Sequence, residues 1–85
     1  MQKYILLCRS ITHAQRLQAT LERMGVRCRI ERPPIGLSEK GCSYAVSLRP
    51  AYFMAAMQHL SGARLLPERI FYSAGDGSYR EILPQ

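Results

Sequence analysis

The hydrophobic positions change their period early in the chain. Residues 3–8 form a short run of aliphatic and aromatic side chains, which favours a buried strand. Thr12, with Gln15 three residues later, has the spacing of a helix N-cap, and Gly25 stands where a glycine commonly ends a helix. The apolar residues between them recur at helical intervals and are Ala14, Leu17, Leu21 and Met24. The first 25 residues therefore predict a strand followed by a helix.

The apolar period falls to two over residues 26–31, where every second residue is apolar and those between are charged. This alternation predicts a half-buried strand with one wet or lightly covered face. Two prolines end it, because proline cannot donate a hydrogen bond to a neighbouring strand. Residues 32–41 are rich in Pro, Gly and Ser and predict a long loop, a feature that often carries function. Alternation resumes over residues 42–48, which we expect to form a third strand.

The second half of the chain repeats this scheme. Pro50 suits the first turn of a helix and Gly62 its end. The apolar stripe between them is Phe53, Met57 and Leu60. Residues 68–72 predict a fourth strand. The Asp-Gly pair at 76–77 predicts a hairpin turn that brings residues 79–83 back as a fifth, edge strand.

The predicted order is strand-helix-strand-strand-helix-strand with a short C-terminal β extension. Two such βαβ halves fit the ferredoxin-like split-βαβ sandwich, an α+β fold with two helices on one face of an antiparallel sheet. The 85 residues leave room for one domain, spanning 1–85. A sheet with an open second face or edge could also pair with a second copy and form a homodimer.

Composition narrows the class of protein. The chain has 12 Lys and Arg against 6 Asp and Glu, a formal net charge of +6. Hydrophobic residues make up 47%, which is ordinary for a globular domain and too high for a disordered one. No apolar run approaches the roughly 18 residues of a membrane span, and the N-terminus lacks a signal-peptide pattern. We therefore expect a cytoplasmic protein that does not enter the membrane.

The positive charge is spread over nearly every predicted element. A surface of this kind can steer an acidic protein partner toward the chain. Binding of RNA is a weaker alternative, because Arg27 and Arg29 on the exposed sheet face have no aromatic pair between them on which bases could stack.

The chain contains three cysteines, and the number and spacing exclude two kinds of site. An odd count without a Cys-x-x-Cys pair argues against a disulfide framework. It also argues against a four-ligand zinc site, since only His13 and His59 could add ligands and no spacing fits. Reduced thiols, with no metal and no cofactor, are the simplest interpretation. Cys8 and Cys28 lie on apolar strand positions and are expected to be core residues. Cys8 stays a minor candidate for chemistry, because it ends a strand near the start of a helix.

Cys42 is the thiol that we expect to be chemical. It ends the long loop and begins a strand, between Gly41 and Ser43. Gly41 allows close approach of a partner. The positive charge of Lys40 favours the thiolate, which is the nucleophilic form. The alternative is a small buried hydrophobe at the start of a strand.

A second cluster stands between the first strand and the first helix. Ser10, Thr12 and His13, near Arg9, could form an anion-binding corner at the helix N-terminus. Plain capping is the favoured interpretation. Elsewhere the sequence has no Gly-rich phosphate loop, no paired carboxylates and no Ser/His/Asp set. A carrier or binding protein is therefore expected rather than a free-standing enzyme.

These residues resemble a known family, the selenium/sulfur carrier protein-like family, a small bacterial domain of unknown function. The resemblance covers residues 3 to about 72. Ser43 stands where the family usually has a glycine after the cysteine. The segments that carry the resemblance are YILLCRS at 4–10, Thr12-His13-Ala14, Pro33-Pro34-Ile35-x-Leu37-Ser38 and Gly41-Cys42-Ser43-Tyr44-Ala45.

The resemblance implies a carrier role. Cys42 would receive a persulfide or selenosulfide from a donor such as a cysteine desulfurase and pass it to an acceptor enzyme of sulfur or selenium metabolism. Ser38, Gly41 and Ser43 would shape the loop, while Lys40 and the nearby helix N-terminus would stabilise the thiolate. The alternative from another class is a regulatory or anion-binding module that uses the same loop and the Thr12-His13 corner without redox chemistry. An RNA-contacting basic domain is the third alternative.

Overall fold

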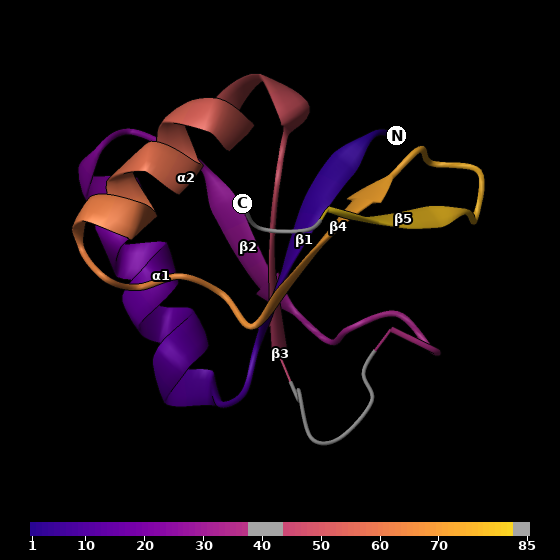
Figure 1. Ribbon diagram of the computed structural model, residues 1–85, viewed down its shortest axis with the longest axis horizontal. Helices are drawn as coiled ribbons and strands as arrows, with labels where there is room; N and C mark the ends of the chain where they lie inside the picture. Colours follow the sequence, from indigo (N-terminus) through magenta and orange to yellow (C-terminus); the bar gives the residue numbers. More distant parts are fainter. Residues whose placement is uncertain (38–43, 83–85) are drawn as a thin grey trace.

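The computed structural model describes residues 1–37 and 44–82 as a sheet covered by two helices (Figure 1). Its elements follow the predicted order. They are β1 (Lys3–Cys8), α1 (Ile11–Arg23), β2 (Cys28–Glu31), β3 (Tyr44–Leu48), a 3-10 turn η1 (Pro50–Tyr52), α2 (Phe53–Gly62), β4 (Arg69–Ser73) and β5 (Tyr79–Ile82).

The five strands form one sheet in the order β2-β3-β1-β4-β5, and every neighbouring pair is antiparallel. β1 lies at the centre, β2 at one edge, and β5 at the other edge beside β4. Both helices lie on the same side of the sheet (Figure 1). The α+β class, the two helices and the fifth edge strand are thereby confirmed.

The start of α1 differs from the prediction, because Ser10 and not Thr12 is the N-cap. Ser10 has extended backbone angles (φ −148°, ψ 163°), and its hydroxyl accepts a hydrogen bond of 3.1 Å from the backbone N–H of His13. β1 ends at Cys8, so Ser10 is the residue at which the chain turns into the helix. Thr12 lies exposed within the first turn. The prediction for Gly25 at the other end is confirmed by its φ of +81° and by the hydrogen bonds that close the last turn.

The helix-facing side of the sheet carries the main core. Leu6 and Cys8 of β1 are fully buried there against Leu17 and Leu21 of α1 and Leu60 of α2. Met24, predicted in the same stripe, is 40% exposed because α1 ends before it. Phe53 at the start of α2 stacks on Tyr4 with ring centroids 3.7 Å apart.

The opposite face of the sheet is partly covered, which corrects the expectation of an open face. Ile5 and Leu7 of β1, Ala45 of β3 and Phe71 of β4 form a second buried cluster, and Leu37 from the segment after β2 completes it. The cause lies in β1, whose apolar residues point to both faces and need cover on both. In the part of the chain that the structure describes, neither helix combines the length and apolarity that a membrane crossing requires.

Candidate functional site

The residues predicted to form the carrier loop, namely Ser38, Lys40, Gly41, Cys42 and Ser43, lie outside the described residues. The structure does describe the residues on each side of them. Leu37 precedes this segment and Tyr44 follows it as the first residue of β3. We call these two residues and their described neighbours the frame of the predicted loop.

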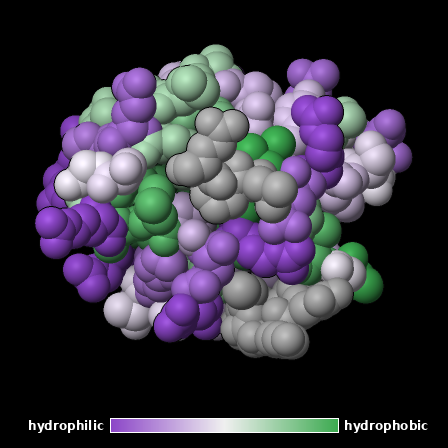
Figure 2. All heavy atoms as spheres, in the orientation of Figure 1, coloured by the Kyte–Doolittle hydropathy of each residue, from purple (hydrophilic) through white to green (hydrophobic). Residues whose placement is uncertain are grey.

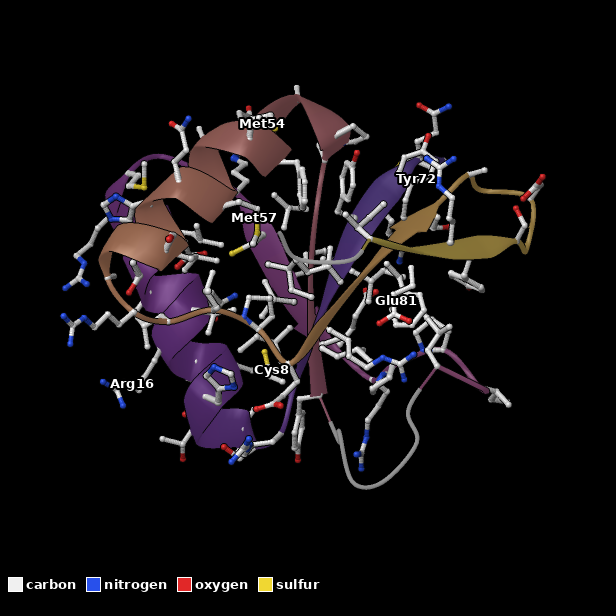
Figure 3. All side chains as sticks on the ribbon, in the orientation of Figure 1. Cys8, Arg16, Met54, Met57, Tyr72 and Glu81 are labelled. Atoms are coloured by element: carbon white, nitrogen blue, oxygen red, sulfur yellow. The ribbon has the colours of Figure 1, made fainter. Side chains whose placement is uncertain are left out.

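Tyr44 enters the sheet beside the start of α1. It lies directly opposite Cys8, the last residue of β1, and Ser10 follows Cys8 by two residues. The beginning of β3, the end of β1 and the first turn of α1 therefore share one end of the sheet (Figures 1 and 3). The N–H groups of a first helical turn create a positive potential. That turn contains no acidic residue, so no carboxylate within it neutralises this potential.

A cation also stands at the base of the loop. The guanidinium carbon of Arg32 lies 5.1 Å from the centroid of the Tyr44 ring, a cation–π distance. The contact joins the first residue after β2 to the first residue of β3, and so closes the two ends of residues 32–44 on each other. It places a permanent positive charge beside a residue that follows Cys42 by two positions.

The other end of the loop is attached to the second face of the sheet. The backbone N–H of Leu37 donates to the carbonyl oxygen of Pro34 at 3.2 Å, and Gly36 has the left-handed φ of +93° that this turn needs. The turn buries Leu37 and leaves Ile35 fully exposed. Figure 2 shows a hydrophobic patch where Figure 1 places this turn. Leu37 thus fixes the point from which the chain continues toward Cys42.

The two described thiols have different surroundings, and neither favours reaction. Cys8 is completely buried between α1 and the sheet (Figure 3), and its Sγ donates to the carbonyl of Leu6. Its assignment to the core is confirmed. Cys28 lies on the edge strand, where it is half-buried and packs against the periphery of the main core. Burial, and secondly the carboxylate of Glu22, raise the pKa of Cys28 to about 11.

The predicted anion corner is assembled, but much of it already has partners. Ser10, Thr12 and His13 all lie at the start of α1. The Ser10 hydroxyl caps the helix, and the Arg9 Nε is bound to a carboxylate oxygen of Glu68 at 2.8 Å. Among the described residues, the Nδ1 of His13 is buried and has no hydrogen-bond partner. Capping accounts for Ser10, and anion binding by the corner stays a prediction.

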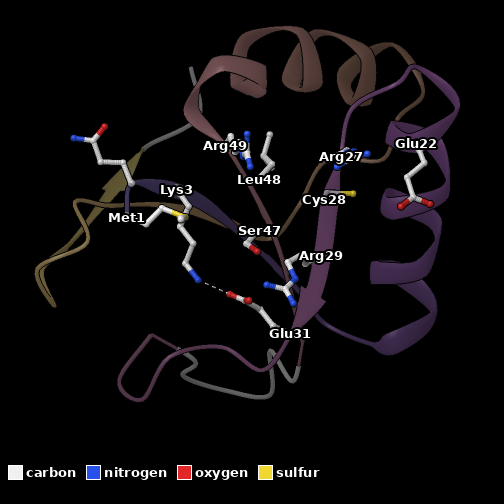
Figure 4. A pocket seen from close by; sticks show the side chains of 11 residues that line it. Met1, Lys3, Glu22, Arg27, Cys28, Arg29, Glu31, Ser47, Leu48 and Arg49 are labelled. Carbon is white, nitrogen blue, oxygen red and sulfur yellow. Dashed lines mark hydrogen bonds and ion pairs between the residues drawn. The ribbon is translucent and has the colours of Figure 1, made fainter.

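Sequence reasoning missed three features, each of which depends on contacts between distant segments. They are the burial of Leu37, the contact of Arg32 with Tyr44, and a groove of about 570 Å³ beside β2 (Figure 4). The exposed arginines of residues 26–31 were the available signal for the groove. In the described part of the chain, no three His, Cys, Asp or Glu residues come together as metal ligands.

Comparison with known proteins gives one match. The family model described as "Putative Se/S carrier protein-like" matches residues 3–72. No curated protein and no solved structure matches the chain. The matched range runs from the first residue of β1 into β4 and includes the whole segment between Leu37 and Tyr44.

Proposed function

Because the chain belongs to the Se/S carrier protein-like family through residues 3–72, we propose that it carries sulfur or selenium on Cys42. A persulfide donor such as a cysteine desulfurase loads the thiol, and an acceptor enzyme of sulfur or selenium metabolism removes the cargo. We place this exchange in the cytoplasm, where thiols stay reduced.

The proposed loading step needs one nucleophile and no cofactor. The Cys42 thiolate attacks the outer sulfur of the donor's persulfide, and a new S–S bond forms. The S–S bond of the donor breaks, and the donor cysteine leaves as a thiolate. The transferred sulfur keeps its oxidation state, so no external oxidant or reductant takes part. Delivery to the acceptor repeats the same exchange in the other direction.

The state of the other two thiols is the observation that carries the proposal. A carrier thiol must be accessible and must ionise near neutral pH. Cys8 is 0% exposed. With a pKa of about 11, Cys28 is ionised in only about one molecule in ten thousand at pH 7. These two findings argue against the two described thiols, and the proposal assigns the carrier role to the third cysteine of the sequence, Cys42.

The frame around the loop supports an ionised thiol at this end of the sheet. The first turn of α1 supplies a positive potential, and Arg32 supplies a full charge beside Tyr44. Lys40 adds a third positive group by its position in the sequence. Each of them favours thiolate over thiol and so favours loading. Ser38, Gly41 and Ser43 are proposed to shape the loop.

We also propose that the fold is a ferredoxin-like variant. In support, β3 separates β1 from β2, and β1 separates β3 from β4, so each helix connection skips one strand. β5 extends the four-stranded arrangement at its β4 edge.

Native-state alkylation tests the proposal. The protein is exposed briefly to iodoacetamide at pH 7, then denatured and digested, and the labelled fraction of each cysteine is measured by mass spectrometry. We expect Cys42 to react at least roughly tenfold faster than Cys28, with half-maximal reactivity below about pH 8.5, because only Cys42 has a substantial thiolate population.

The same labelling in denaturant is the control, since all three cysteines then react at similar rates. Equal reactivity of Cys42 and Cys28 in the native protein would contradict the proposal. So would a Cys42 that stays unlabelled in the native state.

A further inference from the structure

The groove beside β2 follows the whole length of that strand, because its first and last residues, Cys28 and Glu31, both line it. The register pairs Cys28 with Leu48 at one end of the strand and Glu31 with Ala45 at the other. Ser47 is buried to 5% exposure, lines the groove and lies opposite Arg29 (Figure 4). The remaining lining comes from the start of β1, the end of β3, β2 and α1, and consists of Met1, Gln2, Lys3, Glu22, Arg27, Cys28, Arg29, Glu31, Leu48 and Arg49.

One side of β2 has no neighbouring strand. β2 is the edge of the sheet and pairs only with β3. Among the described residues, no other backbone hydrogen bond reaches residues 27–31. Alternate residues of an edge strand point their N–H and C=O groups away from the sheet, where an extended peptide can pair with them.

The groove is positively charged after its internal ion pair is counted. Lys3 Nζ and Glu31 Oε1 lie 2.8 Å apart and neutralise each other. Arg27, Arg29 and Arg49 are exposed and have no ion pair among the described residues, while the other lining carboxylate belongs to Glu22. Three guanidinium groups against one carboxylate give the groove an unbalanced positive charge.

We propose that this groove binds an acidic segment of a partner protein, which adds to β2 as a further strand. Arg27 and Arg29 are two positions apart, the spacing at which side chains of a strand repeat on one face. An extended peptide with Asp or Glu at every second position presents carboxylates at the same repeat. Its backbone pairs with β2, and its carboxylates meet the arginines.

The chemistry of the groove favours a peptide over RNA. None of the described residues that line the groove is aromatic, so they offer bases no surface on which to stack. The edge-strand backbone groups match those of a peptide and have no counterpart on a phosphate chain.

Fluorescence anisotropy with a labelled peptide tests the proposal. The probe is a 12-residue peptide of alternating Glu and Val, titrated with the full chain at low salt. We expect saturable binding that weakens with salt. In the double variant Arg27→Gln/Arg29→Gln we expect affinity to fall about tenfold, the effect of losing two partly exposed ion pairs.

The matched control is Arg16→Gln/Arg80→Gln, which removes the same charge from α1 and β5 outside the groove and should keep the affinity within about twofold. A second probe with alternate backbone amides methylated tests strand addition, and we expect it to bind at least about tenfold more weakly.

Three results would each overturn the proposal. The first is equal loss of affinity in both double variants. The second is equal binding of the methylated peptide. The third is tighter binding of a single-stranded oligouridine of the same length, which would assign the groove to RNA. The measurement involves no thiol, so it is decided separately from the carrier role of Cys42.

Discussion

Cys8 and Cys28 show how the surroundings of a thiol decide its chemistry. Both lie on strand positions that face the helices. Cys8 is in the central strand and has no contact with water, whereas Cys28 is in an edge strand and is only half-buried. Partial burial is enough to raise the pKa of Cys28 to about 11, and the negative charge of Glu22 acts in the same direction.

The raised pKa of Cys28 makes stability depend on pH. The folded protein keeps the Cys28 proton up to about pH 11, while the unfolded chain loses it near 9.0. Folding therefore favours the protonated form, and this contribution is complete below about pH 9 and disappears as the pH rises through 11. Denaturant unfolding should show that wild type loses more stability than Cys28→Ser between these pH values. A Cys28→Ser variant with the same pH dependence as wild type would contradict the assignment.

Ser10 supplies the cap of α1, and its removal has a defined cost. We expect Ser10→Ala to lower the free energy of unfolding by about 1 kcal/mol, because the N–H of His13 loses its acceptor. Thr12→Ala is the control, since Thr12 is exposed within the first turn, and its effect should stay within about 0.5 kcal/mol. Thermal or denaturant unfolding distinguishes the two, and equal effects would contradict the capping role.

The same pair of residues shows what the sequence could predict at this scale. A hydroxyl cap before the Ala14–Leu21 stripe was predictable, but Ser10 and Thr12 both offer a hydroxyl. The choice depends on where β1 stops, and β1 continues to Cys8 through pairing with strands distant in the sequence. Local pattern therefore gives the kind of cap and the tertiary structure gives its position.

Among the elements, the segment between β2 and β3 contributes both to the core and to the proposed site. It begins with the Arg32–Tyr44 contact and passes through the turn that buries Leu37 on the second face of the sheet. This face has no helix, so Leu37 excludes water from Ile5, Leu7 and Phe71. The loop that we assign to chemistry is therefore also part of the core.

Leu37 and Ile35 give a matched test of this anchoring. Leu37 is 9% exposed, and we expect Leu37→Ala to lower the free energy of unfolding by about 2–3 kcal/mol through lost burial. Ile35 belongs to the same turn but is fully exposed, so Ile35→Ala should change stability by less than about 0.5 kcal/mol. Equal effects in denaturant unfolding would show that Leu37 does not anchor the loop.

Element order was predictable because the helices and the strands at 26–31 and 42–48 have clear periods in the sequence, while residues 3–8 and 68–72 are short runs typical of strands. The fifth strand was predictable from the Asp-Gly turn, and its pairing with β4 is observed. The covered second face was not predicted, although β1 has apolar residues on both faces. Which residue supplies the cover is a non-local matter, since Leu37 lies 30 positions after Leu7 in the chain.

In the whole molecule, the cationic side chains behind the net charge of +6 differ in whether they are held in ion pairs. Arg9, Lys3 and Arg69 are used in ion pairs, whereas Arg27, Arg29 and Arg49 line the groove beside β2. The groove also reaches the end of the sheet at which β3 begins, because Glu31 lines it and pairs with Ala45, the residue after Tyr44.

The candidate site could be predicted from the sequence only as a segment. Cys42, Lys40 and the flanking small residues indicate a reactive loop because of their types and spacing. The reasons that exclude Cys8 and Cys28 depend on burial and on the Glu22 carboxylate, which only the fold provides. The positive frame formed by Arg32 and the start of α1 is likewise a product of strand pairing.

Loading with sulfur tests the central claim most directly. The protein is incubated with a cysteine desulfurase and cysteine, and its intact mass is measured with and without reductant. Wild type, Cys8→Ser and Cys28→Ser should each gain about 32 Da, one sulfur atom that reductant removes, and Cys42→Ser should gain nothing. A reducible sulfur adduct that persists in Cys42→Ser, or no adduct on wild type, would contradict the account.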